Sequence, residues 1–337
     1  MRRGSSAATL IVILLAATQA FGMLADVPLP KLVLDSDLVV VGVVKKNAEP
    51  TEMTLELPGW PGAGKQWFVR STFQVERFLH NPNKPAGGRA NDIEILAITP
   101  APRDPGAGPM LMHSEMFFAN LQPGQKYLLI LHKLPGRKEY YVPTYPKNYI
   151  LVNDASQERV AETEKVCDVE RWPWGKEVNG LQLALVPSAS RIPLSRSRKT
   201  RGGPFFDSAL VNVTFALRNT SKNPIALNVY RGDRYLSLTY ASPGHAVKTH
   251  NFYGARVRLA PWSDEKHVLE IPPGEIVFIG PHGPGGYGTH VALEAPPGML
   301  TLQAGYSSDR KASSKSGLNL WTGTLHSADA EVEVIRN

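Results

Sequence analysis

The sequence predicts an all-β protein with two domains, a small β-barrel followed by a β-sandwich, with a short helical connector between them. Most of its apolar runs are short and alternate with polar residues, which is the period of a half-buried strand. Its 28 prolines and 29 glycines fall mostly in dipeptides that are typical of turns. Only residues 154–166 have a helical pattern, so we expect many strands and few helices.

Residues 1–22 have the features of a signal peptide. Arg2 and Arg3 precede a short apolar stretch, residues 10–17, and small residues suitable for cleavage follow between Ala20 and Gly22. The stretch is shorter than the roughly 20 apolar residues of a membrane-spanning helix, and no cysteine stands near the cleavage position to carry a lipid. We therefore expect an exported protein, periplasmic or extracellular, that is not a lipoprotein and has no transmembrane segment in its mature form.

The 337 residues carry a formal charge of +7 and a single cysteine, Cys167. One cysteine cannot form the intrachain disulfides that secreted eukaryotic β-proteins of this size usually have, so we expect a bacterial protein stabilised by core burial. Because the signal peptide takes two arginines and no acidic residue with it, the mature chain carries +5.

The first domain, residues 23–153, is expected to hold five strands, which is enough for a small closed barrel or a sandwich. They lie at residues 39–44, 68–78, 92–98, 127–131 and 140–149, the last interrupted by Pro143 and Pro146. In residues 68–78 the alternation places Val69, Phe73 and Val75 on one face and Arg70, Thr72, Gln74 and Glu76 on the other.

A connector, residues 154–177, begins with the polar helix, capped by Asp154 or Ser156. The second domain, residues 178–337, has seven or eight short alternating strands separated by turn signals, which indicates an immunoglobulin-like β-sandwich. We expect them at residues 179–185, 210–219, 226–230, 235–240, 256–259, 275–279, 300–306 and 331–335. Within 210–219 we expect Val211, Val213, Phe215 and Leu217 to face inward and Asn212, Thr214 and Arg218 outward.

Three similar turns precede strands: Leu121-Gln-Pro-Gly124, Ile271-Pro-Pro-Gly274 and Ala295-Pro-Pro-Gly298. Proline sets φ and glycine accepts positive φ, so each is expected to form a tight turn. After the first turn, Tyr127 stands where the residue of a tyrosine corner would hydrogen-bond back to it.

Residues 34–131 resemble the netrin-like and metalloproteinase-inhibitor type of oligonucleotide-binding (OB) barrel, through Asp37-Leu-Val-Val-Val-Gly42 and Leu121-Gln-Pro-Gly-Gln-Lys-Tyr-Leu-Leu129. The resemblance implies an OB-like fold for the first domain. It does not imply inhibition, because the chain lacks the N-terminal cysteine by which that family meets the metal. The second domain resembles immunoglobulin-like modules of exported bacterial proteins, through Leu217-Arg-Asn-Thr-Ser221, Pro272-Pro-Gly274 and the ending Leu320-Trp-Thr-Gly-Thr324 with Val332-Glu-Val334.

The stretch GPHGPGGYGTH, residues 280–290, contains a Gly-x-Gly-x-x-Gly. In nucleotide-binding proteins this pattern leads from a strand into a helix whose N-terminus holds the phosphates. Here a segment of strand length, residues 289–294, follows, and Pro284 removes a backbone donor. We expect a glycine-rich loop between strands, with no nucleotide and no other cofactor.

Catalytic motifs are not found in the sequence. His282 and His290 could share a metal with His245, His250 or His267, but no carboxylate-rich motif accompanies them, and solvated loop histidines are the preferred interpretation. There is no Gly-x-Ser-x-Gly and no His-Glu-x-x-His, and Cys167 would be reactive only if nearby charge lowered its pKa. We expect a non-catalytic protein, with a hydrolase whose site the sequence hides as an alternative.

One candidate binding site is a basic insert at residues 188–203, which contains no acidic residue. Its cationic side chains are Arg191, Arg196, Arg198, Lys199 and Arg201. It is either an electrostatic patch for an anionic polymer or a flexible solvated loop. A second short motif, Arg231-Gly-Asp233, is interpreted as a turn between strands rather than an adhesion motif.

The other candidate is Trp172-Pro-Trp174, whose aromatic faces could bind a sugar or peptide, whereas Trp321 is expected in the sandwich core. Taken together, the sequence favours an exported interaction protein that binds a protein or glycan partner at the cell envelope or outside, through loops of its two β domains. A carbohydrate-binding module that uses exposed tryptophans is the alternative.

Overall fold

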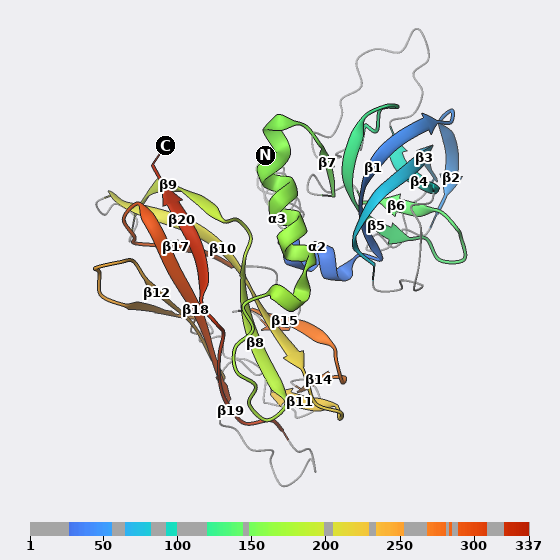
Figure 1. Ribbon diagram of the computed structural model, residues 1–337. Helices are drawn as coiled ribbons and strands as arrows, with labels where there is room; N and C mark the ends of the chain where they lie inside the picture. Colours follow the sequence, from blue (N-terminus) through green and yellow to red (C-terminus); the bar gives the residue numbers. More distant parts are fainter. Residues whose placement is uncertain are drawn as a thin grey trace, which may run out of the picture. The chain divides into compact units, whose positions relative to one another are not determined.

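The computed structural model describes residues 27–55, 65–81, 92–99, 120–143, 148–198, 205–228, 234–252, 268–280, 283–284, 289–308 and 320–336 (Figure 1). They are mostly β-strand, as predicted. The chain divides into two compact units, Met1–Asp168 and Val169–Asn337, a boundary that falls inside the segment expected to be a connector. None of the described helices is long and apolar enough to cross a membrane. The predicted signal peptide lies outside the described residues.

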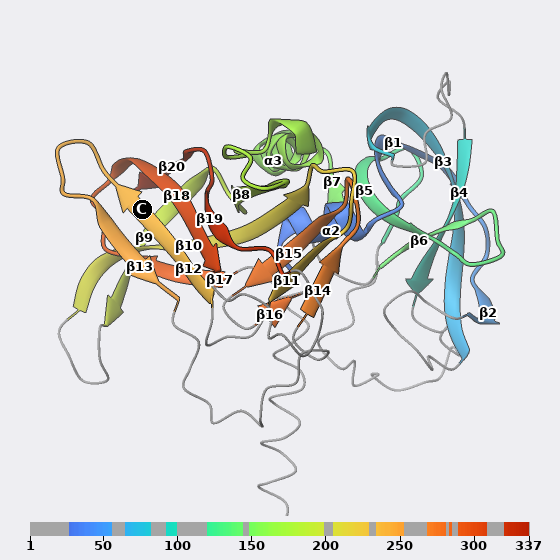
Figure 2. The ribbon, with the colours of Figure 1, turned by 90° about the horizontal axis from the view of Figure 1, so that it is seen from below.

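Unit 1 contains a five-stranded barrel in the order β1-β3-β4-β6-β5, closed by pairing between β5 and β1. The strands are β1 (Leu38–Asn47), β3 (Lys65–His80), β4 (Asp92–Thr99), β5 (Lys126–Lys133) and β6 (Tyr140–Val142). Neighbours are antiparallel except for β4 and β6, which are parallel. Two short strands flank the barrel: β2 (Thr51–Thr54) lies beside β3 (Figures 1 and 2), and β7 (Tyr149–Leu151) pairs with β5. This strand order fits the expected OB-like barrel.

The barrel interior is filled by apolar side chains that alternate along the strands, among them Val40, Val44, Phe73, Val75, Ile95 and Leu129. Tyr127 belongs to this core, and its hydroxyl donates to the Asn120 carbonyl (3.2 Å) and accepts from the Gln122 amide (3.0 Å). The predicted tyrosine corner is therefore confirmed. The turn before it is also confirmed, since the Gln125 amide donates to the Gln122 carbonyl and Gly124 has φ of +80°.

Strand β3 alternates as predicted, but at its start the outer face is buried as well. Phe73 and Val75 face the barrel core, but Val69 is only half-buried and Phe68 is buried on the opposite face. Phe68 packs there with Leu96, Ile98, Leu134 and Tyr141, and with the half-buried Met53 and Leu55. Val69 alternates with Phe68 and so lies on the side of Phe73 and Val75, as predicted, but it is only half-buried there. On the outer face, side chains from the neighbouring segments cover this end of β3 and bury Phe68.

Two α-helices lie among the described residues of unit 1. The sequence did not predict α2 (Leu29–Asp35), which buries Leu32 and Val33. The predicted helix is present as a 3-10 turn, η1 (Asp154–Ser156), followed by α3 (Gln157–Cys167), which begins after Ser156. Helix α3 buries Val160, Val166 and Cys167 and packs against α2, so it is part of unit 1. A second 3-10 turn, η2 (Val169–Arg171), begins unit 2.

Unit 2 is built around β10, which pairs with four other strands. Its strands are β8 (Leu181–Pro187), β9 (Arg191–Arg198), β10 (Phe205–Asn219), β11 (Ile225–Asn228), β12 (Arg234–Ala241), β13 (Lys248–Asn251), β14 (Val268–Ile271), β15 (Ile276–Gly280), β16 (Gly283–Pro284), β17 (Thr289–Leu293), β18 (Gly298–Ser308), β19 (Gly323–His326) and β20 (Ala330–Ile335). Strands β8 and β9 follow one another along one edge of β10, and β15 and β17 follow one another along the other. Strands β13, β12, β18 and β20 continue the sheet beyond β9, and β11 pairs with β14 separately.

The inward positions predicted for β10 are confirmed, because Val211, Val213, Phe215 and Leu217 are all buried in the core of unit 2. Thr214, expected to face solvent, is instead buried. Residues on its own face of the sheet, such as Ala184 and Ala216, are buried as well, so both faces of this central strand are covered. Trp321 lies in the core as predicted, and its indole N–H donates to the Val178 carbonyl (3.2 Å).

Strand β9 passes between two neighbours and was not predicted. Its first residues pair in parallel with β20, and its last residues pair antiparallel with β10. Strands β13, β14 and β19 were also missed, and the strand expected at residues 256–259 lies outside the described residues. Strands β13, β14 and β19 have four residues each, so they carry little periodicity for a sequence pattern to reveal.

Candidate functional site

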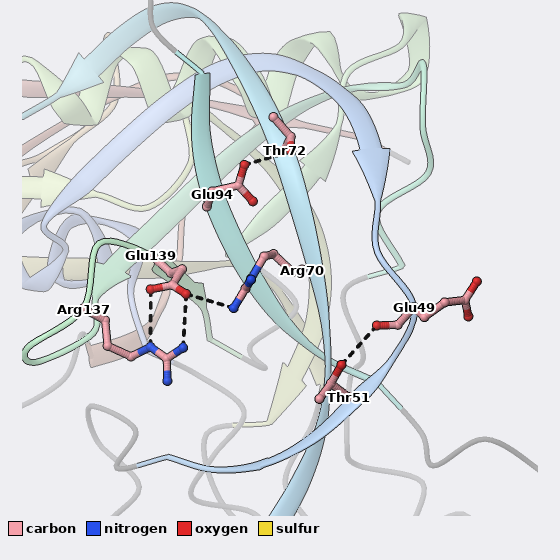
Figure 3. A network of polar contacts seen from close by, with 7 residues as sticks. All are labelled: Glu49, Thr51, Arg70, Thr72, Glu94, Arg137 and Glu139. Atoms are coloured by element: carbon pink, nitrogen blue, oxygen red, sulfur yellow. Dashed lines mark hydrogen bonds and ion pairs between the residues drawn. The ribbon is translucent and has the colours of Figure 1, made fainter.

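A polar surface lies on the outer side of β3 and β4, next to the turn between β5 and β6 (Figure 3). We call it the polar β3–β4 face, and it consists of Arg70, Thr72, Glu94, Arg137 and Glu139. The alternation of β3 and its register with β4 create it, because Arg70 and Thr72 are two residues apart on one side of the strand and Thr72 pairs with Glu94. The turn at residues 134–139 then brings Arg137 and Glu139 to the same surface.

The centre of this face is a carboxylate held between two guanidinium groups. Arg137 donates from Nε to Glu139 Oε2 (3.3 Å) and from Nη2 to Glu139 Oε1 (3.1 Å). Arg70 reaches Oε1 from the barrel wall through its Nη2 (3.1 Å). Figure 3 shows the carboxylate lying between the two arginine side chains. Arg70 is the most open of the three, with 48% of its side chain exposed, compared with 34% for Arg137 and 15% for Glu139.

These contacts favour the ionised form of Glu139. The hydrogen bonds from Arg137 lower the pKa of the Glu139 carboxyl to about 2, against the opposing effect of burial, and the charges of Arg137 and Arg70 act in the same direction. Glu139 is therefore an anion at every physiological pH, and it acts as a hydrogen-bond acceptor rather than as a proton donor.

Beside the two arginines, the face offers hydroxyl and carboxylate groups. The Thr72 hydroxyl donates to Glu94 Oε1 (2.8 Å) across the β3–β4 pair. At the start of β2, the Thr51 hydroxyl donates to the Glu49 carbonyl, and both residues are exposed (Figure 3). The surface can therefore both donate hydrogen bonds, from guanidinium groups, and accept them, at Glu94.

Sequence reasoning placed Arg70 and Thr72 correctly on the non-core side of their strand but did not select this face as a site. Arg137 and Glu139 stand 67 and 69 residues further along the chain, so no local pattern joins them to Arg70. The only indirect clue was the strand order of an OB-like barrel. In that order β6 pairs in parallel with β4, which holds the β5–β6 turn beside β3 and β4.

The predicted tryptophan platform takes a different form. Trp172 is 5% exposed and Trp174 is half-buried, and their rings stack with centroids 5.9 Å apart. The Arg218 guanidinium lies over the Trp174 ring, 4.5 Å from its centroid, and also pairs with Glu170 (2.8 Å). The expectation of an exposed pair is wrong for Trp172, because its ring packs against Trp174 and Phe278.

Half of the basic insert, residues 191–198, is a β-strand. Residues 191–198 form β9, so the interpretation of this part as a flexible solvated loop is wrong, because it pairs with β20 and β10. Arg191 is exposed and forms an ion pair with Glu333 of β20 (2.9 Å). Arg196 and Arg198 belong to the paired strand, and Lys199 and Arg201 lie outside the described residues, as does Arg231-Gly-Asp233.

The glycine-rich stretch joins strands, in agreement with the sequence. Gly280 ends β15 and pairs with Gly283 of β16, which makes a hairpin, and the stretch leads into β17 rather than into a helix. His245, His250 and His290 are placed by the structure, whereas His267 and His282 fall outside the described residues. Within the part of the chain that the structure describes, no three His, Cys, Asp or Glu residues are grouped to hold a metal ion.

Cys167 does not have the electrostatic surroundings of a nucleophile. Burial raises the pKa of its thiol to about 12, and the negative charge of Glu164 acts in the same direction. In the barrel, burial lowers the pKa of His132 although Asp37 lies 4.0 Å from its Nδ1 and acts to raise it. Both shifts favour the uncharged form of the side chain at neutral pH.

We compared the sequence with protein families and with curated proteins. No protein-family model matches the chain, and no curated protein is significantly similar to it in sequence.

Proposed function

We propose that this chain is an exported, non-catalytic interaction protein that binds a protein or glycan partner on the polar β3–β4 face of its barrel. The observation that carries the proposal is the Glu139 carboxylate shared by Arg70 and Arg137, with nearly half of the Arg70 side chain open to solvent. A guanidinium presents five donors in a fixed plane and is enriched at binding interfaces. In this site one guanidinium, that of Arg70, stands on strand β3, and the other, that of Arg137, stands on the β5–β6 turn.

The position of this face in the fold supports the proposal. In OB-like barrels, ligands bind on the face of the second and third strands, between the loops that follow the first and fourth strands. In this barrel those strands are β3 and β4, and the bordering segments include Glu49, Thr51 and the turn at residues 134–139. The fold supplies only an analogy for the position of the site, and the residues of the face supply its chemistry.

The non-catalytic part of the proposal rests on the titration of the described groups. The depressed pKa of Glu139 makes its carboxylate a weak base, and the raised pKa of Cys167 keeps its thiol protonated at neutral pH, so neither group is suited to acid–base or nucleophilic catalysis. The hydrolase alternative gains no support from them. Export rests on the sequence of residues 1–22 and on the single cysteine.

For unit 2 we propose an immunoglobulin-like sandwich. The support is topological: β10 has β8 and β9 on one edge and β15 and β17 on the other, while β12, β18 and β20 form a second antiparallel group. Strand β9 passes from β10 to β20 and so links the two groups. In this arrangement the Trp172–Trp174–Arg218 stack would stabilise the start of unit 2.

The test compares two arginines on the same strand. The mature chain, residues 23–337, is screened against a glycan array and against purified extracellular proteins of bacteria, and each binder is measured again with Arg70→Ala and with Arg77→Ala. Arg77 is also exposed and ion-paired, but with Glu164 of α3 and away from the polar β3–β4 face. We expect Arg70→Ala to weaken binding about tenfold, which is roughly 1.4 kcal/mol, and Arg77→Ala to leave it within twofold. Equal binding by the wild type and Arg70→Ala would overturn the proposed face.

A further inference from the structure

The Glu139 side chain is not needed to close the turn in which it stands. The turn is already held by its backbone, because the Leu134 amide donates to the Glu139 carbonyl (3.3 Å) and the Arg137 amide donates to the Leu134 carbonyl (3.1 Å). The carboxylate instead extends toward β3 and occupies the two guanidinium groups. It fills the position in which a carboxylate from another molecule would find the same donors.

The Arg70 contact is suited to exchange. Within the described part of the chain, the Arg70 guanidinium donates only to Glu139, and only through Nη2. Because nearly half of the Arg70 side chain is exposed, water and salt screen its ion pair with Glu139, which therefore contributes little to stability. An external carboxylate could take two parallel hydrogen bonds from the Arg70 fork, which is the stronger geometry.

The rest of the face distinguishes between kinds of carboxylate ligand. Next to Arg70 the Thr72 hydroxyl is held by Glu94, whose carboxylate is a hydrogen-bond acceptor. Glu94 can accept from a hydroxyl but would repel a carboxylate in the same place, so the face favours a ligand that presents sugar hydroxyls beside each carboxylate over a peptide with adjacent acidic side chains. The net positive charge of the chain attracts an anionic polymer to its surface.

We propose that Glu139 is a built-in occupant of a carboxylate site formed by Arg70 and Arg137, and that the partner is a glycan carrying uronic-acid carboxylates, one of which displaces Glu139 from Arg70. This inference rests on the proposed function, since it names the ligand class of the same face. It assigns Glu139 an autoinhibitory role, because the ligand must compete with it.

The probe is an oligogalacturonate, with its methyl ester as the uncharged control ligand, titrated into the mature chain by calorimetry at low salt. We expect the acid to bind and the ester to bind at least tenfold more weakly. Glu139→Gln should raise the affinity for the acid about fivefold, because the competing anion is gone while the side-chain size is kept. Glu139→Ala serves as a second variant, and the near-ultraviolet circular dichroism of each variant checks its fold.

The outcomes separate the inference from the proposed function. If Arg70→Ala loses binding but Glu139→Gln leaves it unchanged or weaker, Glu139 is not an occupant, and the inference fails while the binding face stands. Equal binding of the methyl ester, tighter binding of a polyglutamate peptide, or no binding of the acid by any variant would each overturn the carboxylated glycan. If the acid binds and neither Arg70→Ala nor Arg137→Ala affects it, the polar β3–β4 face itself is the wrong site.

Discussion

Gly175 offers a stringent test of the packing at the start of unit 2. A Cβ on Gly175 would lie 2.7 Å from the His326 carbonyl carbon, 3.0 Å from the Ser327 Cα, and closer still to the His326 carbonyl oxygen. All three are backbone atoms, so no side-chain rotation can relieve the overlap. Carbon atoms pack at about 3.5–4.0 Å, and the residue 173–175 segment would therefore have to move by roughly an ångström.

That movement would disturb the hydrogen bonds that hold this segment. The Gly175 amide donates to the Leu183 carbonyl (2.8 Å), Gln182 Nε2 donates to the Gly175 carbonyl (3.0 Å), and the Ala328 amide donates to the Pro173 carbonyl (3.0 Å). At about 1 kcal/mol each, their loss lowers the free energy of unfolding of unit 2 by ~3 kcal/mol. A unit of this size should then melt about 6–12 °C lower.

The assay is thermal unfolding of the mature chain followed by tryptophan fluorescence, with Gly244→Ala as the matched control. Gly244 is in the same unit, has φ of +76°, and has no atom within 4 Å of the position of an added Cβ, so its replacement should cost about 1–2 kcal/mol from backbone strain alone. Gly175→Ala should be clearly the more damaging change. If the two variants melted at the same temperature, the close backbone approach at Gly175 would be refuted.

Three further predictions concern unit 1. The folded pKa of Glu139 lies below its unfolded value of about 4.5, so the contribution of this carboxylate to stability is present above pH 4.5 and is lost as the pH falls toward 2. Because Arg70 and Arg137 are open to solvent, we expect Glu139→Gln to lower the free energy of unfolding by only about 1 kcal/mol at pH 7 and not at all near pH 2. Urea unfolding across that pH range measures the difference. Tyr127→Phe removes both hydrogen bonds of the tyrosine corner and should lower the urea-derived stability by about 1–3 kcal/mol, and a change below 0.5 kcal/mol would contradict the corner. Cys167 should react with a thiol reagent at pH 8 at least a hundredfold more slowly in the native chain than in urea, whereas comparable rates would show that the thiol is not buried.

Local patterns in the sequence were sufficient to predict much of the architecture. Most strands longer than four residues were found, because alternation along a strand of five or more residues reflects which face meets a core, as in β10. The turns at Leu121–Gly124 and Ile271–Gly274 and the corner at Tyr127 were also predicted correctly, since the φ values of proline and glycine and the reach of one tyrosine hydroxyl are local properties. At the third Pro-Gly sequence, Gly298 has φ of +123° and is already the first residue of β18. The four-residue strands β13, β14 and β19 were missed because four residues carry little alternation to recognise.

The candidate site depends on contacts that no local pattern contains. Arg70 and Glu139 meet because the parallel pairing of β4 and β6 brings the β5–β6 turn beside β3. The same holds for the burial of Trp172 and Thr214 and for the pairing of β9, which were read from the sequence as exposed or loop positions. The sequence by itself determined the β class, the turns and the alternation of the core strands, because these depend on neighbouring residues. Only the tertiary structure decided which charged and aromatic side chains share a surface, because that depends on strand order across the whole chain.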